Sequence, residues 1–232
     1  MTIVRERRTH KTEDRRRLPI AALALGLALV VSAYGMARAI ESPEHWWLGW
    51  VALLPLFASI RVLSPIHALL AGGLWGLSLF VSAVAVTNAS IAPSATSLVL
   101  LCAVPSLYTF LGAKLTRQVG FSPYLLALGW VGVELALRPL GLHHGLLAAT
   151  QGDDGWIIRL VGSLAGYALV AFVVAYVNAV LLSVLSRVPV STVGQRFVRG
   201  LSPSLGRRFV LEGWYGLFHL IRPAQPRAPP VA

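Results

Sequence analysis

Charged residues are scarce in this sequence, making up 12% of its 232 residues against 56% hydrophobic residues. Soluble domains average about 25% charged residues, so this composition excludes an ordinary water-soluble enzyme or binding domain. Cysteine is nearly absent as well. The single Cys102 rules out an intrachain disulfide framework, and its position inside an apolar run favours a small buried residue over a nucleophile.

Recognisable catalytic motifs are also missing from the sequence. It has no glycine-rich phosphate loop with its lysine, no histidine pair at helical metal spacing and no serine in a nucleophile elbow. We therefore predict no self-contained catalytic site, no metal site and no cofactor.

The chain has six long apolar segments instead. A membrane-spanning helix needs about 20 mostly apolar residues, and turn-prone or charged residues separate the segments. The segments are residues 18–37, 46–60, 65–86, 94–113, 123–137 and 160–185. The sequence therefore predicts an all-α membrane protein, a bundle of about six transmembrane helices.

Basic residues are distributed asymmetrically around these segments. With a cytoplasmic amino terminus, all but three of the 20 lysine and arginine residues fall on the inner side, and the three outer ones are Arg38, Arg138 and Arg159. This matches the positive-inside rule with both termini in the cytoplasm. Attraction to anionic lipid headgroups explains the net charge of +11, so we predict no nucleic-acid partner.

These patterns divide the chain into three parts. Residues 1–17 form a basic cytoplasmic N-terminus, residues 18–187 the transmembrane domain, and residues 188–232 a basic, proline-rich cytoplasmic tail. The first apolar run exceeds the usual 7 to 15 residues of a signal peptide, which favours an uncleaved anchor. In the tail, the apolar and aromatic residues 209–221 predict an interfacial helix, with a shortened seventh span as the alternative.

One charged residue lies in the fifth apolar segment and another follows it directly. Glu134 and Arg138 stand four residues apart, so on a helix they share a face and are able to pair. Ionisable groups at membrane depth suggest a functional site. The alternative is structural, because Arg138 would reach the headgroups from the outer end of its span and satisfy Glu134 on the way.

The outer loop HHGLLAATQGDDGW contains residues of metal-ligand type, namely His143, His144, Asp153 and Asp154. Their spacing matches no known metal site, so we predict a polar loop at headgroup level. Elsewhere, Asn178 is expected to form a hydrogen bond between helices. Three glycines predict close helix packing: Gly72, Gly73 and Gly76.

Residues 48–185 carry an ordered set of weak motifs. In chain order they are WVALLPLFASIR, LLAGGLWGLSLF, SLYTFLGAKLTR, GWVGVELALRPLG, ATQ and GSLAGYALVAFVVAYVNAVL. In order and spacing this region resembles the membrane-embedded N-terminal part of apolipoprotein N-acyltransferase, the last enzyme of bacterial lipoprotein maturation. The resemblance implies a multi-pass protein of the bacterial cytoplasmic (inner) membrane.

Several positions match the family residue by residue. Glu134 corresponds to the glutamate of a Glu-x-x-Arg pattern, although Arg138 comes one position late. Gln151 falls where the family has the glutamine of Gly-Tyr-Ser-Gln. Asn178 and Pro55 match a late-helix asparagine and a second-span proline. The resemblance thus implies that Glu134, Arg138 and Gln151 bind lipid or substrate at headgroup level.

The family also has an extracytoplasmic nitrilase-like domain with a Glu, Lys and Cys catalytic set, which has no counterpart in this sequence. We therefore expect a membrane-domain homologue that is catalytically incompetent alone, with an implied role in lipoprotein N-acylation through binding of phospholipid or lipoprotein acyl chains. A separate nitrilase-like subunit is the implied partner. The alternative is a six-helix substrate-binding subunit of a small-molecule transporter.

Overall fold

The computed structural model of the chain describes residues 3–86, 94–140, 146–151, 160 and 162–186. Within these ranges the elements are all helices, which confirms the predicted all-α fold. The chain divides into two compact units. The first unit comprises residues 1–24 and 186–232, of which the helical residues 3–24 and Ser186 are described. The second unit, Leu25–Leu185, is called the bundle below.

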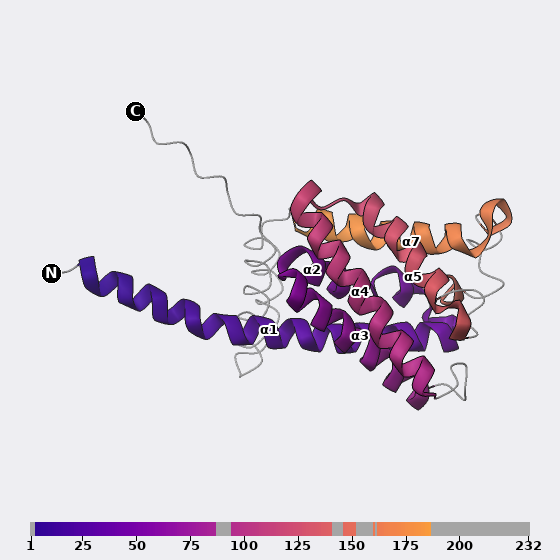
Figure 1. The fold of residues 1–232 in the computed structure, drawn as a ribbon, viewed down its shortest axis with the longest axis horizontal. Coiled ribbons are helices and arrows are strands. Elements are labelled where there is room, and N and C mark those ends of the chain that lie inside the picture. Colours follow the sequence, from indigo (N-terminus) through magenta and orange to yellow (C-terminus); the bar gives the residue numbers. More distant parts are fainter. Residues whose placement is uncertain (1–2, 87–93, 141–145, 152–159, 161, 187–232) are drawn as a thin grey trace. The chain divides into compact units, whose positions relative to one another are not determined.

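The longest helix is α1 (Ile3–Glu41), which continues from the basic N-terminal segment into the first apolar segment. The other elements follow in the order η1 (Pro43–Trp50), α2 (Leu54–Val62), α3 (Pro65–Val86), α4 (Ala95–Val119), α5 (Pro123–Leu137), η2 (Arg138–Leu140), α6 (Leu146–Ala149) and α7 (Ser163–Leu185). Here η marks a 3-10 helix. Figure 1 shows their arrangement.

Four helices are long and apolar enough to cross a membrane, judged by length and composition. These candidate spans are Ala22–Glu41, Pro65–Ala85, Ala95–Val119 and Gly166–Leu185. The 15-residue α5 rises only about 22 Å, which is shorter than the hydrocarbon core of a bilayer. The count of six spans and the cytoplasmic position of both termini stay predictions.

The second predicted span, residues 46–60, is not one continuous helix. The 3-10 helix η1 and the nine-residue α2 are separated by a turn at residues 51–53. Pro55 lies in the first turn of α2, where its missing N–H costs no helical hydrogen bond. The break leaves backbone groups that need partners from within the protein, because lipid offers none.

Short polar and glycine residues set the ends of α4. The Ser94 hydroxyl accepts a hydrogen bond from the N–H of Ser97 at 3.1 Å and forms a capping box with it. The helix ends at Val119, followed by Gly120 with a positive φ of 85°, which favours glycine. No glycine or proline interrupts residues 114–119, so α4 continues beyond the predicted end at residue 113.

Helices α3 and α4 pack side by side along their length (Figure 1). A Cβ atom at Gly76 would overlap the carbonyl oxygen of Leu101, and one at Gly72 would overlap that of Pro105. Proline has no N–H, so Pro105 leaves the Leu101 carbonyl without its usual helical donor. The prediction of close packing is therefore confirmed at Gly72 and Gly76, where the two backbones meet.

A hydrogen bond crosses the same contact between the two helices. The hydroxyl of Thr109 donates to the carbonyl oxygen of Ala68 in α3 at 2.7 Å. Thr109 is fully buried, so its hydroxyl requires such an acceptor. Small residues and one polar side chain thus join α3 to α4, which is the usual way in which helices associate in lipid.

Four aromatic side chains fill the middle of the bundle. The rings of Trp75 and Trp130 meet edge to face at 5.8 Å, and Tyr108 meets Trp130 in the same way at 5.5 Å. Phe57 of α2 completes the group, with its ring 6.4 Å from that of Tyr108. The buried indole N–H of Trp75 donates to the Ser32 hydroxyl of α1 at 3.0 Å. These contacts join α1 to α5 around one core.

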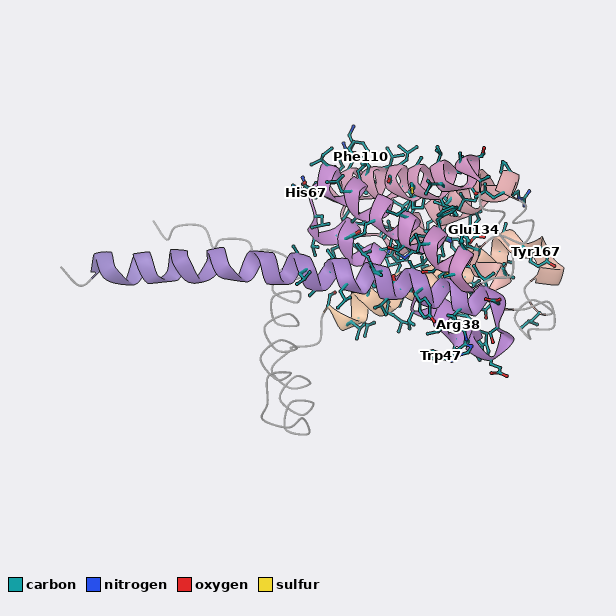
Figure 2. All side chains as sticks on the ribbon, turned by 90° about the horizontal axis from the view of Figure 1, so that it is seen from below. Arg38, Trp47, His67, Phe110, Glu134 and Tyr167 are labelled. Carbon is teal, nitrogen blue, oxygen red and sulfur yellow. The ribbon has the colours of Figure 1, made fainter. Side chains whose placement is uncertain are left out.

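The two ends of the bundle carry different residues (Figure 2). Arg38, Trp47, Glu134 and Tyr167 lie toward one end, and His67 and Phe110 lie toward the other. We call these the Glu134 end and the His67 end. Large apolar side chains are exposed along the helices between the ends, including Leu70, Val81, Val99 and Val184. An apolar surface of this kind suits contact with lipid chains rather than water.

Candidate lipid-binding site

Glu134 of α5 is a buried acidic residue, with 5% of its surface exposed. Its Oε1 atom accepts two hydrogen bonds, one from the indole N–H of Trp130 at 2.9 Å and one from the backbone N–H of Leu147 at 2.8 Å. Trp130 precedes Glu134 by one turn of α5, so both side chains lie on the same helix face. The carboxylate therefore joins α5 to α6.

The contact with Leu147 explains how the four-residue α6 is held in place. The first N–H groups of a helix have no partners inside that helix. Glu134 supplies one from a different helix, where a serine or aspartate of the same segment would usually do so. Leu146, Leu147 and Ala148 are buried, so α6 is packed into the bundle.

The second carboxylate oxygen of Glu134, Oε2, is buried and forms no hydrogen bond of ordinary geometry with the described residues, although the backbone N–H of Leu146 also lies near the carboxylate. Two other buried side-chain atoms of the described residues share this property: Glu41 Oε2 and His45 Nδ1. Glu41 and His45 are close in sequence to Arg38 and Trp47, which lie at the same end as Glu134 (Figure 2). All three atoms without partners thus lie at one end of the bundle.

The structure does not form the predicted pair between Glu134 and Arg138. Glu134 is buried, whereas Arg138 is exposed, and no ion pair joins them. The α-helix ends at Leu137 and Arg138 begins the 3-10 helix η2, with its N–H bonded to the carbonyl of Leu135. A 3-10 helix does not keep the i, i+4 alignment of an α-helix, so the spacing no longer brings the two charges together.

Gln151 lies just after α6 and is also buried. Its Oε1 accepts a hydrogen bond from the indole N–H of Trp50 at 3.2 Å, and its Nε2 donates to the Thr150 hydroxyl at 2.8 Å. The Thr150 hydroxyl in turn donates to the carbonyl of Leu147 at 2.7 Å. Glu134 and Gln151 therefore hold the two ends of α6, which brings two of the three predicted site residues together.

Asn178 of α7 supplies the partners that the broken second segment requires. Its Oδ1 accepts from the backbone N–H of Leu53 at 3.1 Å, and its Nδ2 donates to the carbonyl of Gly49 at 3.1 Å. Both backbone groups lie where η1 gives way to the turn before α2. The prediction of a hydrogen bond between segments is confirmed, and the bond stabilises an irregular backbone.

Gly49 shows how closely η1 approaches the segment that follows α6. A Cβ atom at Gly49 would overlap the Thr150 hydroxyl and lie 3.3 Å from Nε2 of Gln151. The carbonyl of Gly49 is meanwhile bonded to Asn178. Only glycine fits against Thr150 and Gln151. With the bond to Asn178, this means that η1, the end of α6 and α7 meet at this position.

Sequence reasoning missed Trp50, Trp130 and Thr150, which complete the hydrogen bonds of Glu134 and Gln151. Trp130 carried a signal, because a buried indole N–H needs an acceptor and Glu134 stands one turn away on the same helix. Trp50 and Thr150 carried none, since their partners come from distant segments.

The predicted polar loop falls mostly outside the described residues. His143, His144, Asp153 and Asp154 all lie there, as does the predicted interfacial helix at residues 209–221. Within the part of the chain that the structure describes, no group of three or more His, Cys, Asp or Glu residues is placed to hold a metal ion. Trp46 and Trp47 are exposed, as expected of interfacial aromatic residues.

Comparison with known proteins adds a family to this geometry. Residues 32–180 match the family model described as the apolipoprotein N-acyltransferase N-terminal domain. Curated proteins and solved structures gave no match. The matched region covers more than half of the chain and includes Glu134, Arg138, Gln151 and Asn178. The chain therefore belongs to the family of the apolipoprotein N-acyltransferase N-terminal domain.

Proposed function

We propose that this chain acts in lipoprotein N-acylation in the bacterial inner membrane by binding the acyl chains and headgroups of phospholipid or lipoprotein. The chain's membership of the family supports a role in lipoprotein N-acylation. The exposed apolar surfaces of its helices suit the binding of acyl chains. The covalent chemistry comes from a nitrilase-like domain or subunit, which is the partner that the family suggests. Glu134, Gln151 and Arg138 bind the polar part of the lipid.

One observation carries the proposal, namely the state of the Glu134 carboxylate. Its Oε1 atom accepts two hydrogen bonds, whereas its buried Oε2 atom accepts none. A buried oxygen without a partner is costly, on the order of 1–3 kcal/mol. A donor group from a bound lipid at this end of the bundle would remove that cost.

Arg138 adds a second charged group near the end of the same helix. It is exposed and lies one turn after Glu134, about 6 Å further along the chain axis. Its guanidinium group suits the phosphate or carbonyl oxygens of a lipid. In this arrangement Glu134 binds a donor and Arg138 binds an acceptor of the same polar group.

The decisive variant is Glu134→Gln, because it changes the atom that lacks a partner and keeps an acceptor for Trp130 and Leu147. We expect the full-length protein with this change to retain about tenfold less phospholipid or diacylated lipopeptide, the loss expected for a charge-assisted hydrogen bond. Native mass spectrometry of the protein extracted in a neutral detergent measures the retained lipid. Arg138→Gln should reduce retention as well, with the fold unchanged.

Glu44→Gln provides the matched control. It makes the same chemical change on an exposed glutamate of η1, so retention should equal that of the unmodified protein. Equal retention in Glu134→Gln and Glu44→Gln would contradict the assignment of Glu134 to lipid binding. The family match gives no support to the alternative of a transporter subunit, and co-purification of a cytoplasmic ATPase would contradict the proposed function as a whole.

A further inference from the structure

The 3-10 helix η1 lies directly against Gln151 of the candidate site. The indole N–H of Trp50 donates to Gln151 Oε1 at 3.2 Å, and the carbonyl of Trp46 accepts from Gln151 Nε2 at 3.5 Å. A Cβ atom at Gly49, which also belongs to η1, would lie 3.3 Å from the same Nε2 atom. Three residues of η1 thus lie around one side-chain amide.

Both N–H groups of the Gln151 amide are used in this arrangement. One donates to the Thr150 hydroxyl at 2.8 Å, and the other donates to the carbonyl of Trp46. Only 6% of the Gln151 surface is exposed. An oxygen atom of a lipid therefore reaches this amide only by taking the place of the Trp46 carbonyl, which accepts the longer of the two bonds.

The structure of η1 favours such an exchange. The helix extends over eight residues, whereas 3-10 helices longer than about four residues are uncommon because their hydrogen bonds have poorer geometry. Ser42, which precedes η1, forms no side-chain capping bond. Near the other end, Asn178 of α7 donates to the carbonyl of Gly49 at 3.1 Å. Gly49 is therefore the fixed point of η1, and its first residues are the part able to move.

Two buried atoms beside these first residues lower the cost of moving them. They are Oε2 of Glu41 and Nδ1 of His45, neither of which has a hydrogen-bond partner. Burying a polar atom without a partner is unfavourable, because the atom loses its hydrogen bonds to water. Movement of η1 away from the bundle would give both atoms access to water or headgroups. That gain offsets the loss of the bonds to Gln151.

We propose that η1 is a strap over the Gln151 side of the lipid-binding site, and that the polar group of a lipid releases it by replacing Trp46 and Trp50 on the Gln151 amide. This inference rests on the proposed function, because it concerns lipid binding at the same site. The exposed Trp47, at the Glu134 end, stays at the membrane interface while η1 pivots near Gly49 (Figure 2). Lipid has to displace the strap, so a weakened strap gives tighter lipid binding.

Trp50→Phe tests the strap, because it removes the indole N–H and keeps an aromatic ring. The full chain in a neutral detergent is titrated with dioleoylphosphatidylglycerol. Native mass spectrometry measures binding, and amide hydrogen exchange is followed at residues 44–50. In the unmodified protein the lipid should raise this exchange about threefold. Trp50→Phe should show the raised exchange without lipid and should bind the lipid about threefold more tightly, since one bond no longer opposes binding.

Trp47→Phe is the matched control, because it makes the same change on an exposed tryptophan of η1. It should equal the unmodified protein in both measurements. Lipid that lowers exchange at residues 44–50 would overturn the strap, as would unchanged or weaker lipid binding by Trp50→Phe.

Glu134→Gln, measured in the same titration, separates failure of the strap from failure of the proposed function. Weaker binding by Glu134→Gln, together with exchange in η1 that lipid leaves unchanged in the unmodified protein, would overturn the strap alone. Equal binding by Glu134→Gln and the unmodified protein would overturn the proposed function, and with it the release of the strap by lipid.

Discussion

Replacing Gly76 by alanine is expected to lower the free energy of unfolding by about 3 kcal/mol, near the upper end of the usual cost of overpacking. The added Cβ atom would overlap the carbonyl oxygen of Leu101, which is backbone and has little freedom to move. The melting temperature in detergent, followed by circular dichroism, should fall by about 10 °C. The reason is that α3 and α4 would have to separate along their whole contact.

Gly132→Ala is the control for this change. A Cβ atom at Gly132 of α5 meets no atom within 4 Å, so alanine should be neutral or stabilising by up to about 1 kcal/mol through its higher helix propensity. Equal melting temperatures for Gly76→Ala and Gly132→Ala would show that α3 and α4 do not approach as closely as the structure has them.

Replacing Asn178 by alanine is expected to cost about 3 kcal/mol, because it removes the partners of two buried backbone groups. The N–H of Leu53 loses its acceptor and the carbonyl of Gly49 loses its donor. Lipid supplies no replacement, so the segment from η1 to α2 should become less ordered. Amide hydrogen exchange at residues 49–53 should rise along with the loss of thermal stability.

Two further variants separate the role of Asn178 from a general effect of losing a polar side chain. Asn178→Asp keeps the acceptor for Leu53 and removes the donor to Gly49, so its stability should be intermediate. Ser78→Ala removes a hydroxyl that bonds only to the carbonyl of Leu74 in its own helix, and should change stability by less than about 0.5 kcal/mol. Unchanged exchange at residues 49–53 in Asn178→Ala would contradict the assignment.

Much of the fold was predictable because it depends on local patterns. The apolar segment at residues 65–86 and the segment at residues 123–137 correspond to α3 and α5 as the structure has them. Proline at the first helical position marks the start of both helices. The second segment was mispredicted as one helix, because the partners that stabilise its break lie in α7, 125 residues away from Leu53.

The sequence predicted which residues belong to the candidate site, but not how they are arranged. The ionisable Glu134 stood out in an apolar segment, and family resemblance pointed to Gln151. Neither pattern revealed that both residues hold α6, or that Arg138 would be exposed and form no ion pair with Glu134. Those facts depend on the end of α5 at Leu137 and on the approach of η1 at Gly49.

The sequence by itself determined that the protein is helical, apolar and a member of its family, because composition, periodicity and motif order are properties of the chain alone. The tertiary structure decided which polar groups meet. Trp130 and Leu147 share one oxygen of Glu134 and leave the other without a partner. Contact between α2 and α4 brings Gly112 against Ile60. Such pairings depend on the distance between segments in space, which hydrophobic patterning does not encode.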